Sequence, residues 1–380
     1  MVKYTLNHLE KGLIEYIDHK RYLWLMAIML PVIPLGAIAL YFQTHQAWLL
    51  AMPLLLFYGV IPIVDLIVGE DENNPPEAIV PQLECDNYYR WLAIATVPLH
   101  FLVLIAIAWV VGTETLSPII VFALALTAGA YSGIGISTAH ELGHKNTPLE
   151  KWMAKILLAV PAYGHFGIEH NRGHHIWVAT PEDPASARMG ESIYAFACRE
   201  IPGAFMRGFN LEKQRLANKG QSFWSVENDL LQSYALSALL QGCLIYAFGW
   251  IMLPFLIIHN VWAWFILTSA NYIEHYGLLR GRLPNGRYEK CQPHHSWNAN
   301  FIISNVQFFN IQRHSDHHAN PTRRYQSLRN FDQIPQMPIG YHGMYMLAYC
   351  PPLWFRVMDK KLLSLPHING DLNKVNQQAS

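Results

Sequence analysis

The sequence predicts an all-α integral membrane protein in which six transmembrane helices carry a histidine-rich cytoplasmic cap. Three observations predict this class. Of the 380 residues, 52% are apolar and only 14% are charged, against roughly 25% charged residues in ordinary soluble proteins. The apolar residues gather into six runs of about 20, the length that a helix needs to cross a membrane. The chain also contains 19 histidines, several of which cluster near the ends of these runs.

Charge and cysteine content exclude several other classes. The 27 basic residues balance 27 acidic ones, so the chain has no overall positive field for binding nucleic acid. The high apolar content excludes a disordered chain. The five cysteines include no C-x-x-C pair, which excludes an internal zinc ribbon, a rubredoxin-type iron site and a cysteine-ligated iron–sulfur cluster. Charged residues interrupt residues 1–21, which therefore do not form a signal peptide.

Each predicted span is long enough to cross a hydrocarbon core of about 30 Å as a helix. Prolines inside several spans are tolerated because neighbouring helices can satisfy the freed carbonyl groups. The acidic, proline-rich linker between the second and third spans is predicted to be an ordered loop or a short helix. The six spans are predicted at residues 22–42, 47–67, 91–111, 117–137, 230–253 and 255–276.

Basic residues are confined to one side of the predicted membrane. The short linkers on the opposite side contain no lysine or arginine, so all 27 basic residues lie in the termini and in the remaining linkers. Since cytoplasmic loops carry an excess of basic residues, we expect both termini and the long linkers to be cytoplasmic. We predict one membrane-embedded domain over residues 1–380, with a cap from residues 138–229 and 277–368 and a disordered tail at 369–380.

Nine histidines form four clusters at the cytoplasmic ends of the spans or just beyond them. Residues four apart on a helix share a face, so the H-x3-H of the first cluster can present both rings to one ion, as can His170 and His174 of the second. The adjacent His175 then points about 100° away, toward a second ion. Nine imidazoles are too many for a single ion and suit two ions. The candidate metal ligands are His140, His144, His170, His174, His175, His275, His314, His317 and His318.

The setting of the clusters favours iron, although imidazole also suits zinc, copper and nickel. Hydrolytic zinc chemistry needs a polarisable carbonyl or phosphoryl group. A site at the base of a lipid-embedded bundle instead receives substrates with few polar groups, whose unactivated C–H bonds require an oxidant derived from O₂. Five carboxylates near the clusters are candidates to orient the rings, with a solvated or structural charge as the alternative for each and a bridging role left open. They are Glu141, Glu169, Asp183, Glu274 and Asp316.

Four motifs resemble those of the integral-membrane alkane 1-monooxygenases, which are non-haem diiron alkane hydroxylases of the membrane fatty acid desaturase and hydroxylase superfamily. The third of these motifs separates the family from the rest of the superfamily, and the six-span layout also matches. The resemblance therefore covers most of the chain, and it implies that all nine clustered histidines bind iron. The motifs are HELGHK at 140–145, EHNRGHH at 169–175, NYIEHYGL at 271–278 and QRHSDHHA at 312–319.

The resemblance implies two iron ions, Fe²⁺ or Fe³⁺, that use O₂ to hydroxylate the terminal methyl group of medium-chain n-alkanes to 1-alkanols. Because the chain has no fused rubredoxin, it implies electrons from a separate rubredoxin, with rubredoxin reductase and NAD(P)H upstream. It also implies a bacterial inner-membrane enzyme, in contact with lipid and without a nucleic-acid partner. Basic residues near the clusters are candidates for docking an acidic rubredoxin. They are Arg172, Arg313, Arg323, Arg324 and Arg329.

Two kinds of alternative remain open. Within the same superfamily, the chain is also compatible with a fatty-acyl desaturase or hydroxylase, or with a xylene-type methyl monooxygenase. From a different class, a membrane metal transporter is the rival. A transporter places its ligands near the middle of the bilayer. The clusters here lie at one end of the predicted spans, which favours an enzyme.

Overall fold

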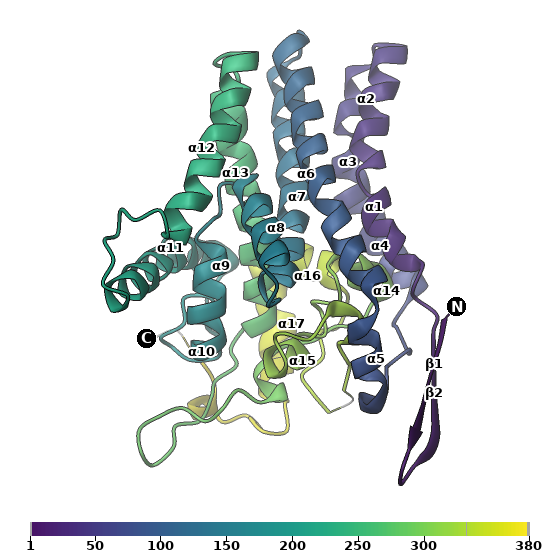
Figure 1. Ribbon diagram of the computed structural model, residues 1–380, viewed down its shortest axis with the longest axis vertical. Helices are drawn as coiled ribbons and strands as arrows, with labels where there is room; N and C mark the ends of the chain where they lie inside the picture. Colours follow the sequence, from purple (N-terminus) through teal and green to yellow (C-terminus); the bar gives the residue numbers. More distant parts are fainter. Residues whose placement is uncertain (1, 332, 378–380) are drawn as a thin grey trace.

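A computed structural model describes residues 2–331 and 333–377. Long helices stand side by side, and the chain between and after them folds into a cap at one end of the bundle (Figure 1). Five helical segments are long and apolar enough to span a membrane, and a sixth is obtained when a bent pair is counted as one span. This confirms a helical membrane protein. The five are Ala47–Val68, α6 (Asn87–Thr113), α7 (Pro118–Gly143), α12 (Asp229–Phe248) and α13 (Met252–His275).

The first two predicted spans are irregular helices. The first is broken into Leu23–Met29 and α2 (Val32–Thr44), which meet at 41°. Pro31 lies at the break, where proline cannot donate a helical hydrogen bond and clashes with the preceding turn. The second span contains a π-helical turn at Leu56–Val60, between α3 (Met52–Leu55) and α4 (Ile61–Val68).

The turn between the last two spans lies earlier than predicted. The chain leaves α12 at Gly249, whose φ of 79° is in the left-handed region that favours glycine. Pro254, which separates the predicted spans 230–253 and 255–276, lies instead in the first turn of α13. Proline is tolerated there because the first helical N–H groups have no partner within the helix.

Helices α7 and α13 run in the same direction and form the most extensive helix pair of the bundle. Gly129 of α7 allows the close approach, since a Cβ atom there would lie 2.8 Å from the carbonyl oxygen of His259 on α13. Small residues at such positions let two membrane helices pack backbone to backbone. The pairing brings the C-terminal ends of both helices, with His140 and His275, to the same end of the bundle.

The cap consists of short helices and loops from two parts of the chain. In the sequence, the first part lies between α7 and α12 and the second part follows α13. The second part packs beneath the long helices in Figure 1. The helices of the first part are α8 (Pro148–Ala159), α9 (Phe166–Glu169), a π-helical turn at His170–His174, α10 (His175–Trp177) and α11 (Ile193–Asn218). Those of the second part are α14 (Ile302–Gln307), α15 (His314–Ala319), α16 (Tyr341–Ala348) and α17 (Pro351–Leu363).

Two features depart from the sequence-based prediction. Residues before the first span form an antiparallel hairpin of β1 (Val2–His8) and β2 (Gly12–Asp18), so the fold is not purely α-helical. The tail predicted to be disordered is ordered as far as Gln377, because Val375 pairs with Leu278 and Gln377 with Met189. Residues 378–380 of that tail lie outside the described residues.

The linker after the second span forms the short helix α5 (Val80–Cys85).

We expect Gly129→Ala to lower the stability of the solubilised protein by about 1–3 kcal/mol, the usual cost of overpacking. The added methyl group would press on backbone, which cannot move aside as a side chain can. The matched control is Gly242→Ala in α12, where a Cβ atom meets nothing within 4 Å. The measurement is thermal unfolding in detergent. Equal melting temperatures for the two variants would contradict the close α7–α13 contact.

Candidate metal centre

All nine predicted histidines converge at the capped end of the bundle, where they form two groups. Within each group, one ring nitrogen per residue lies within 4.8 Å of every other. The groups are thus one set of five and one set of four nitrogens. The first group is His140, His144, His170, His175 and His317. The second group is His174, His275, His314 and His318.

A π-helical turn decides how the second cluster divides between the two groups. The sequence predicts that His170 and His174 share a face, but this prediction is wrong. Residues 170–174 form a π-helix, in which the repeat is i to i+5. His170 therefore joins His175 in the first group, with their Nε2 atoms 3.0 Å apart, while His174 turns to the second.

The other clusters follow regular helical spacing. His140 and His144 lie one turn apart at the end of α7, and their Nε2 atoms are 3.2 Å apart. On α15, His314 and His318 lie one turn apart with Nε2 atoms separated by 2.9 Å. His317, between them, faces the first group. Residues 170–175 and residues 314–318 thus each supply histidines to both groups, which sets the distance between the two groups.

The spacing of the ring nitrogens fits bound metal ions. Six pairs of Nε2 atoms, each pair within one group, lie 2.9–3.2 Å apart. Nitrogen lone pairs that face each other repel unless a proton or a cation lies between them. Two nitrogens bound at right angles by one ion, each at about 2.1 Å, would lie about 3.0 Å apart. Both groups therefore have the donor type and the spacing of a metal site.

Burial keeps most of these rings in the form that binds metal. Loss of hydration on burial, together with the neighbouring rings, lowers the pKa of His144, His170, His175, His314 and His317 well below the usual value for histidine. At neutral pH these rings are uncharged and each retains a free lone pair.

Asp183 orients His174, as the sequence predicts for one of its carboxylates. Its Oδ2 atom accepts a hydrogen bond from Nδ1 of His174 at 2.9 Å. The opposite nitrogen, Nε2, is buried without a hydrogen-bond partner among the described residues and points into the second group. Burial opposes charge on Asp183, but His174 and Arg207 hold the pKa of its carboxyl below the usual range. Such a carboxylate fixes the tautomer and increases the basicity of a ligand ring.

Glu274 lies beside the second group. Its Oε2 atom is 3.3 Å from Nε2 of His314, and its Oε1 atom accepts a hydrogen bond of 2.6 Å from the Tyr341 hydroxyl. Tyr341, on α16, belongs to no histidine cluster, and no signal in the sequence connects it with the site. The carboxylate is therefore held in place from outside the clusters.

The remaining three candidate carboxylates have other partners. Glu141 pairs with Lys145 at 3.0 Å, Glu169 accepts from Nε of Arg207 at 2.8 Å, and Asp316 pairs with Arg323 at 2.9 Å. The prediction that they orient ligand rings is replaced by a structural role. Each holds a cation that fastens a segment of the cap.

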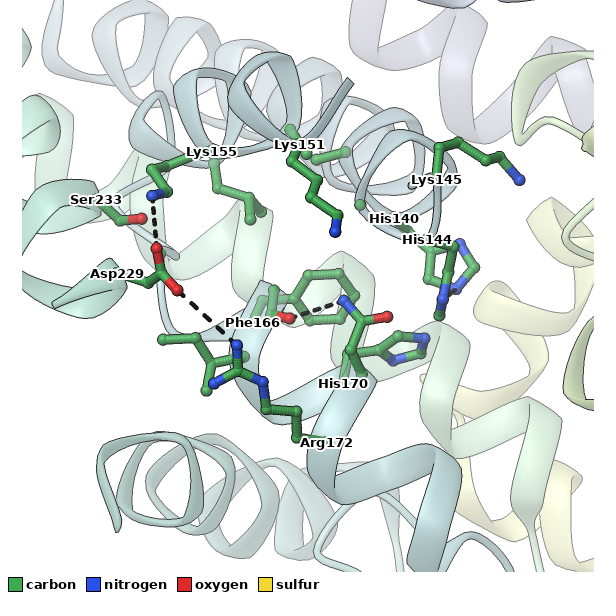
Figure 2. A pocket seen from close by; sticks show the side chains of 18 of the residues that line it. His140, His144, Lys145, Lys151, Lys155, Phe166, His170, Arg172, Asp229 and Ser233 are labelled. Carbon is green, nitrogen blue, oxygen red and sulfur yellow. Dashed lines mark hydrogen bonds and ion pairs between the residues drawn. The ribbon is translucent and has the colours of Figure 1, made fainter. Parts of the chain in front are cut away.

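A cavity of about 790 Å³ opens onto the first group. Four of the five rings of that group line it, with His140, His144 and His170 drawn in Figure 2. Lys155 and Arg172 project into the cavity and both reach the carboxylate of Asp229, at 2.8 and 3.9 Å. The first group is therefore approached through a cavity of mixed lining, whose charged residues are five lysines and arginines and two acidic residues.

Most of the arginines predicted to dock a partner are engaged inside the protein. Arg313 is fully buried, with Nη2 2.7 Å from Asp71 and Nη1 2.7 Å from the carbonyl oxygen of Leu328. These contacts of Arg313 hold the chain in place directly before His314. Arg323 and Arg329 pair with Glu77, and Arg324 pairs with Glu150. Arg172 alone among the five retains a substantially exposed side chain, at 42%.

We expect Asp183→Asn to weaken metal binding by about 10- to 100-fold, because the ring of His174 loses its charged acceptor. Asp316→Asn is the matched control, since that carboxylate lies in a histidine cluster but holds Arg323. Metal content after dialysis against graded chelator concentrations measures the difference. Unchanged retention in Asp183→Asn, or an equal loss in both variants, would contradict the orienting role of Asp183.

Comparison with known proteins agrees with this architecture. The sequence profile of the fatty acid desaturase family matches residues 116–348, which include all nine histidines. Alkane 1-monooxygenase 1 of Alcanivorax borkumensis is 51% identical over 96% of this chain and 89% of its own length. Alkane 1-monooxygenase of Ectopseudomonas oleovorans is 52% identical over 95% of this chain and 90% of its own length.

A more distant relative is the hydroxylase component of xylene/toluene monooxygenase from Pseudomonas putida. It is 30% identical over 66% of this chain and 66% of its own length. The identity with the two alkane 1-monooxygenases is much higher and extends over nearly the whole chain. The chain therefore belongs to the alkane 1-monooxygenases, within the fatty acid desaturase family of multi-pass membrane enzymes.

Proposed function

We propose that this enzyme inserts one atom of O₂ into a terminal methyl C–H bond of medium-chain n-alkanes and releases 1-alkanols. The observation that carries the proposal is the convergence of nine imidazoles into two groups at the end of an apolar helix bundle. The two highly similar relatives, both alkane 1-monooxygenases, support the same reaction. The nine histidines are proposed to bind two ions, five nitrogens at one and four at the other.

Iron is the metal that we propose for both sites. Structural and catalytic zinc sites take four ligands in a tetrahedron. The first group offers five nitrogens, and its separations of 3.0–3.2 Å suit neighbouring ligands at right angles. Imidazole ligands suit iron. Iron, when bound, supplies the chemistry that activates O₂ for attack on an unactivated C–H bond.

The chain itself contributes side chains that are held in fixed orientations around this chemistry. The hydrogen bond from His174 to Asp183 holds that ring in the tautomer whose Nε2 is free, and Tyr341 fixes Glu274 beside the second group. Transfer of an alkane from water into an apolar pocket releases about 0.8 kcal/mol per CH₂. A substrate already dissolved in lipid gains much less, so the shape of the protein must position the methyl group.

Electrons are proposed to come from a separate rubredoxin, reduced by rubredoxin reductase and NAD(P)H, because the sequence contains no C-x-x-C pair of its own. The distribution of basic residues supports an inner-membrane enzyme with both termini and the metal sites on the cytoplasmic side. A cation-lined cavity beside the first group supports electron delivery by an acidic protein there.

Hydroxylation of an aromatic side-chain methyl group is the second candidate, favoured by the 30% identity with the xylene/toluene enzyme. A metal transporter is disfavoured because both histidine groups lie at one end of the bundle, whereas transport sites lie near the bilayer midplane. Product analysis with octane, xylene and an acyl-CoA separates the oxidation reactions.

We expect protein purified from iron-replete cells to contain two irons per chain and to convert octane to 1-octanol with rubredoxin, its reductase and NAD(P)H. His275→Ala removes one nitrogen of the second group, so we expect it to lose one iron or all turnover. His19→Ala, which changes an exposed histidine outside every candidate metal group of the described residues, is the control. Wild-type iron content and turnover in His275→Ala would remove His275 from the ligand set.

A further inference from the structure

Glu200 is a buried carboxyl group without a cation. It lies on α11 and is 1% exposed, yet none of the ion pairs within residues 2–331 and 333–377 includes it. Its two oxygens contact neutral groups of α13. The Thr268 hydroxyl lies 2.7 Å from Oε2, and the Asn271 amide donates to Oε1 at 3.2 Å. A buried carboxylate with only these partners is costly, which favours the protonated acid.

The charges around Glu200 strengthen this preference. Glu169 of α9 and Asp183 of the loop that follows α10 are both negative neighbours, and both are held by the single guanidinium of Arg207. The Tyr163 hydroxyl is a further titratable neighbour. Arg207 therefore pairs with two of the three carboxyl groups, and Glu200 is the one without an ion pair. Burial, reinforced by Glu169, raises the pKa of Glu200 to about 7.

The contacts of Glu200 lead toward the metal centre. Thr268, Asn271 and His275 are spaced i, i+3 and i+7 on α13, so they form one stripe along the helix. Because Oε1 already accepts from the Asn271 amide, the carboxyl proton belongs on Oε2, facing the Thr268 oxygen. A hydroxyl both accepts and donates protons. Thr268 is fully buried, so this contact is shielded from bulk water.

We propose that Glu200 is a proton-relay residue that stores a proton one to two helical turns from His275 and passes it, through Thr268, toward the oxygen atom that is reduced to water. This inference rests on the proposed function. That reaction converts R–CH₃, O₂, two protons and two electrons into R–CH₂OH and H₂O, with the electrons supplied by rubredoxin. Glu200 supplies one of the two protons, becomes a carboxylate and regains a proton from the aqueous side before the next turnover.

Glu200→Gln preserves the shape of the side chain but removes its proton. Positioned acids contribute typically 10²–10⁴-fold to a rate, and we expect turnover to fall by at least tenfold. Since the acid is the active form, wild-type turnover should decline as the pH rises through about 7, and this decline should be absent in the variant. Metal content should remain that of the wild type. The matched control is Glu212→Gln, because Glu212 is a buried carboxyl on the same helix that is paired with Arg215 and Arg172.

Infrared spectroscopy of the metal-free protein tests the protonation directly. At pH 6 we expect a carbonyl-stretch band of a protonated carboxylic acid that is lost in Glu200→Gln and retained in Glu212→Gln. Thr268→Val should keep the band but lose turnover, and this variant also serves if Glu200→Gln does not fold. Absence of a Glu200 band would overturn the proposal, as would wild-type turnover in either Glu200→Gln or Thr268→Val. If the wild type makes no alkanol, the proposed function fails instead, while the band still reports the state of Glu200.

Discussion

Nine imidazole rings with their lone pairs directed inward are the constraint on which the rest of the structure depends. Facing nitrogens repel, so the rest of the polypeptide must hold these rings together. The parallel pair α7 and α13 does most of this, because their close crossing at Gly129 brings His140 and His275 to the same depth. The cap then closes over the two helix ends from two separate parts of the chain.

Buried charge fastens that cap. Arg207 binds the carboxylates of Glu169 and Asp183. Arg313, which directly precedes the fourth histidine cluster, binds Asp71. Buried ion pairs add little to stability over apolar packing, but breaking one is strongly destabilising. Their value here is positional, since each one ties a histidine-bearing segment to a distant part of the chain. Because Arg207 pairs with Glu169 and Asp183, Glu200 is left without an ion pair, which favours its protonated form.

The features that were predictable from the sequence depend on local composition and spacing. Span lengths follow from hydropathy, and the nine histidines stand out by their clusters. The division of the rings between the sites was not predictable, because the π-helical turn at 170–174 changes the repeat by one residue. The burial of Arg313 against Asp71 and the contact of Tyr341 with Glu274 join segments that are 242 and 67 residues apart in the sequence. No alternation or spacing within one segment encodes such contacts.

The division of the nine rings into five and four is tested most directly by counting iron in two neighbouring variants. His317 and His318 are adjacent on α15 but face different groups. The account predicts two irons per chain in the wild type, about one in His317→Ala, about one in His318→Ala, and none in the double variant. A double variant that holds as much iron as either single variant would contradict two separate sites.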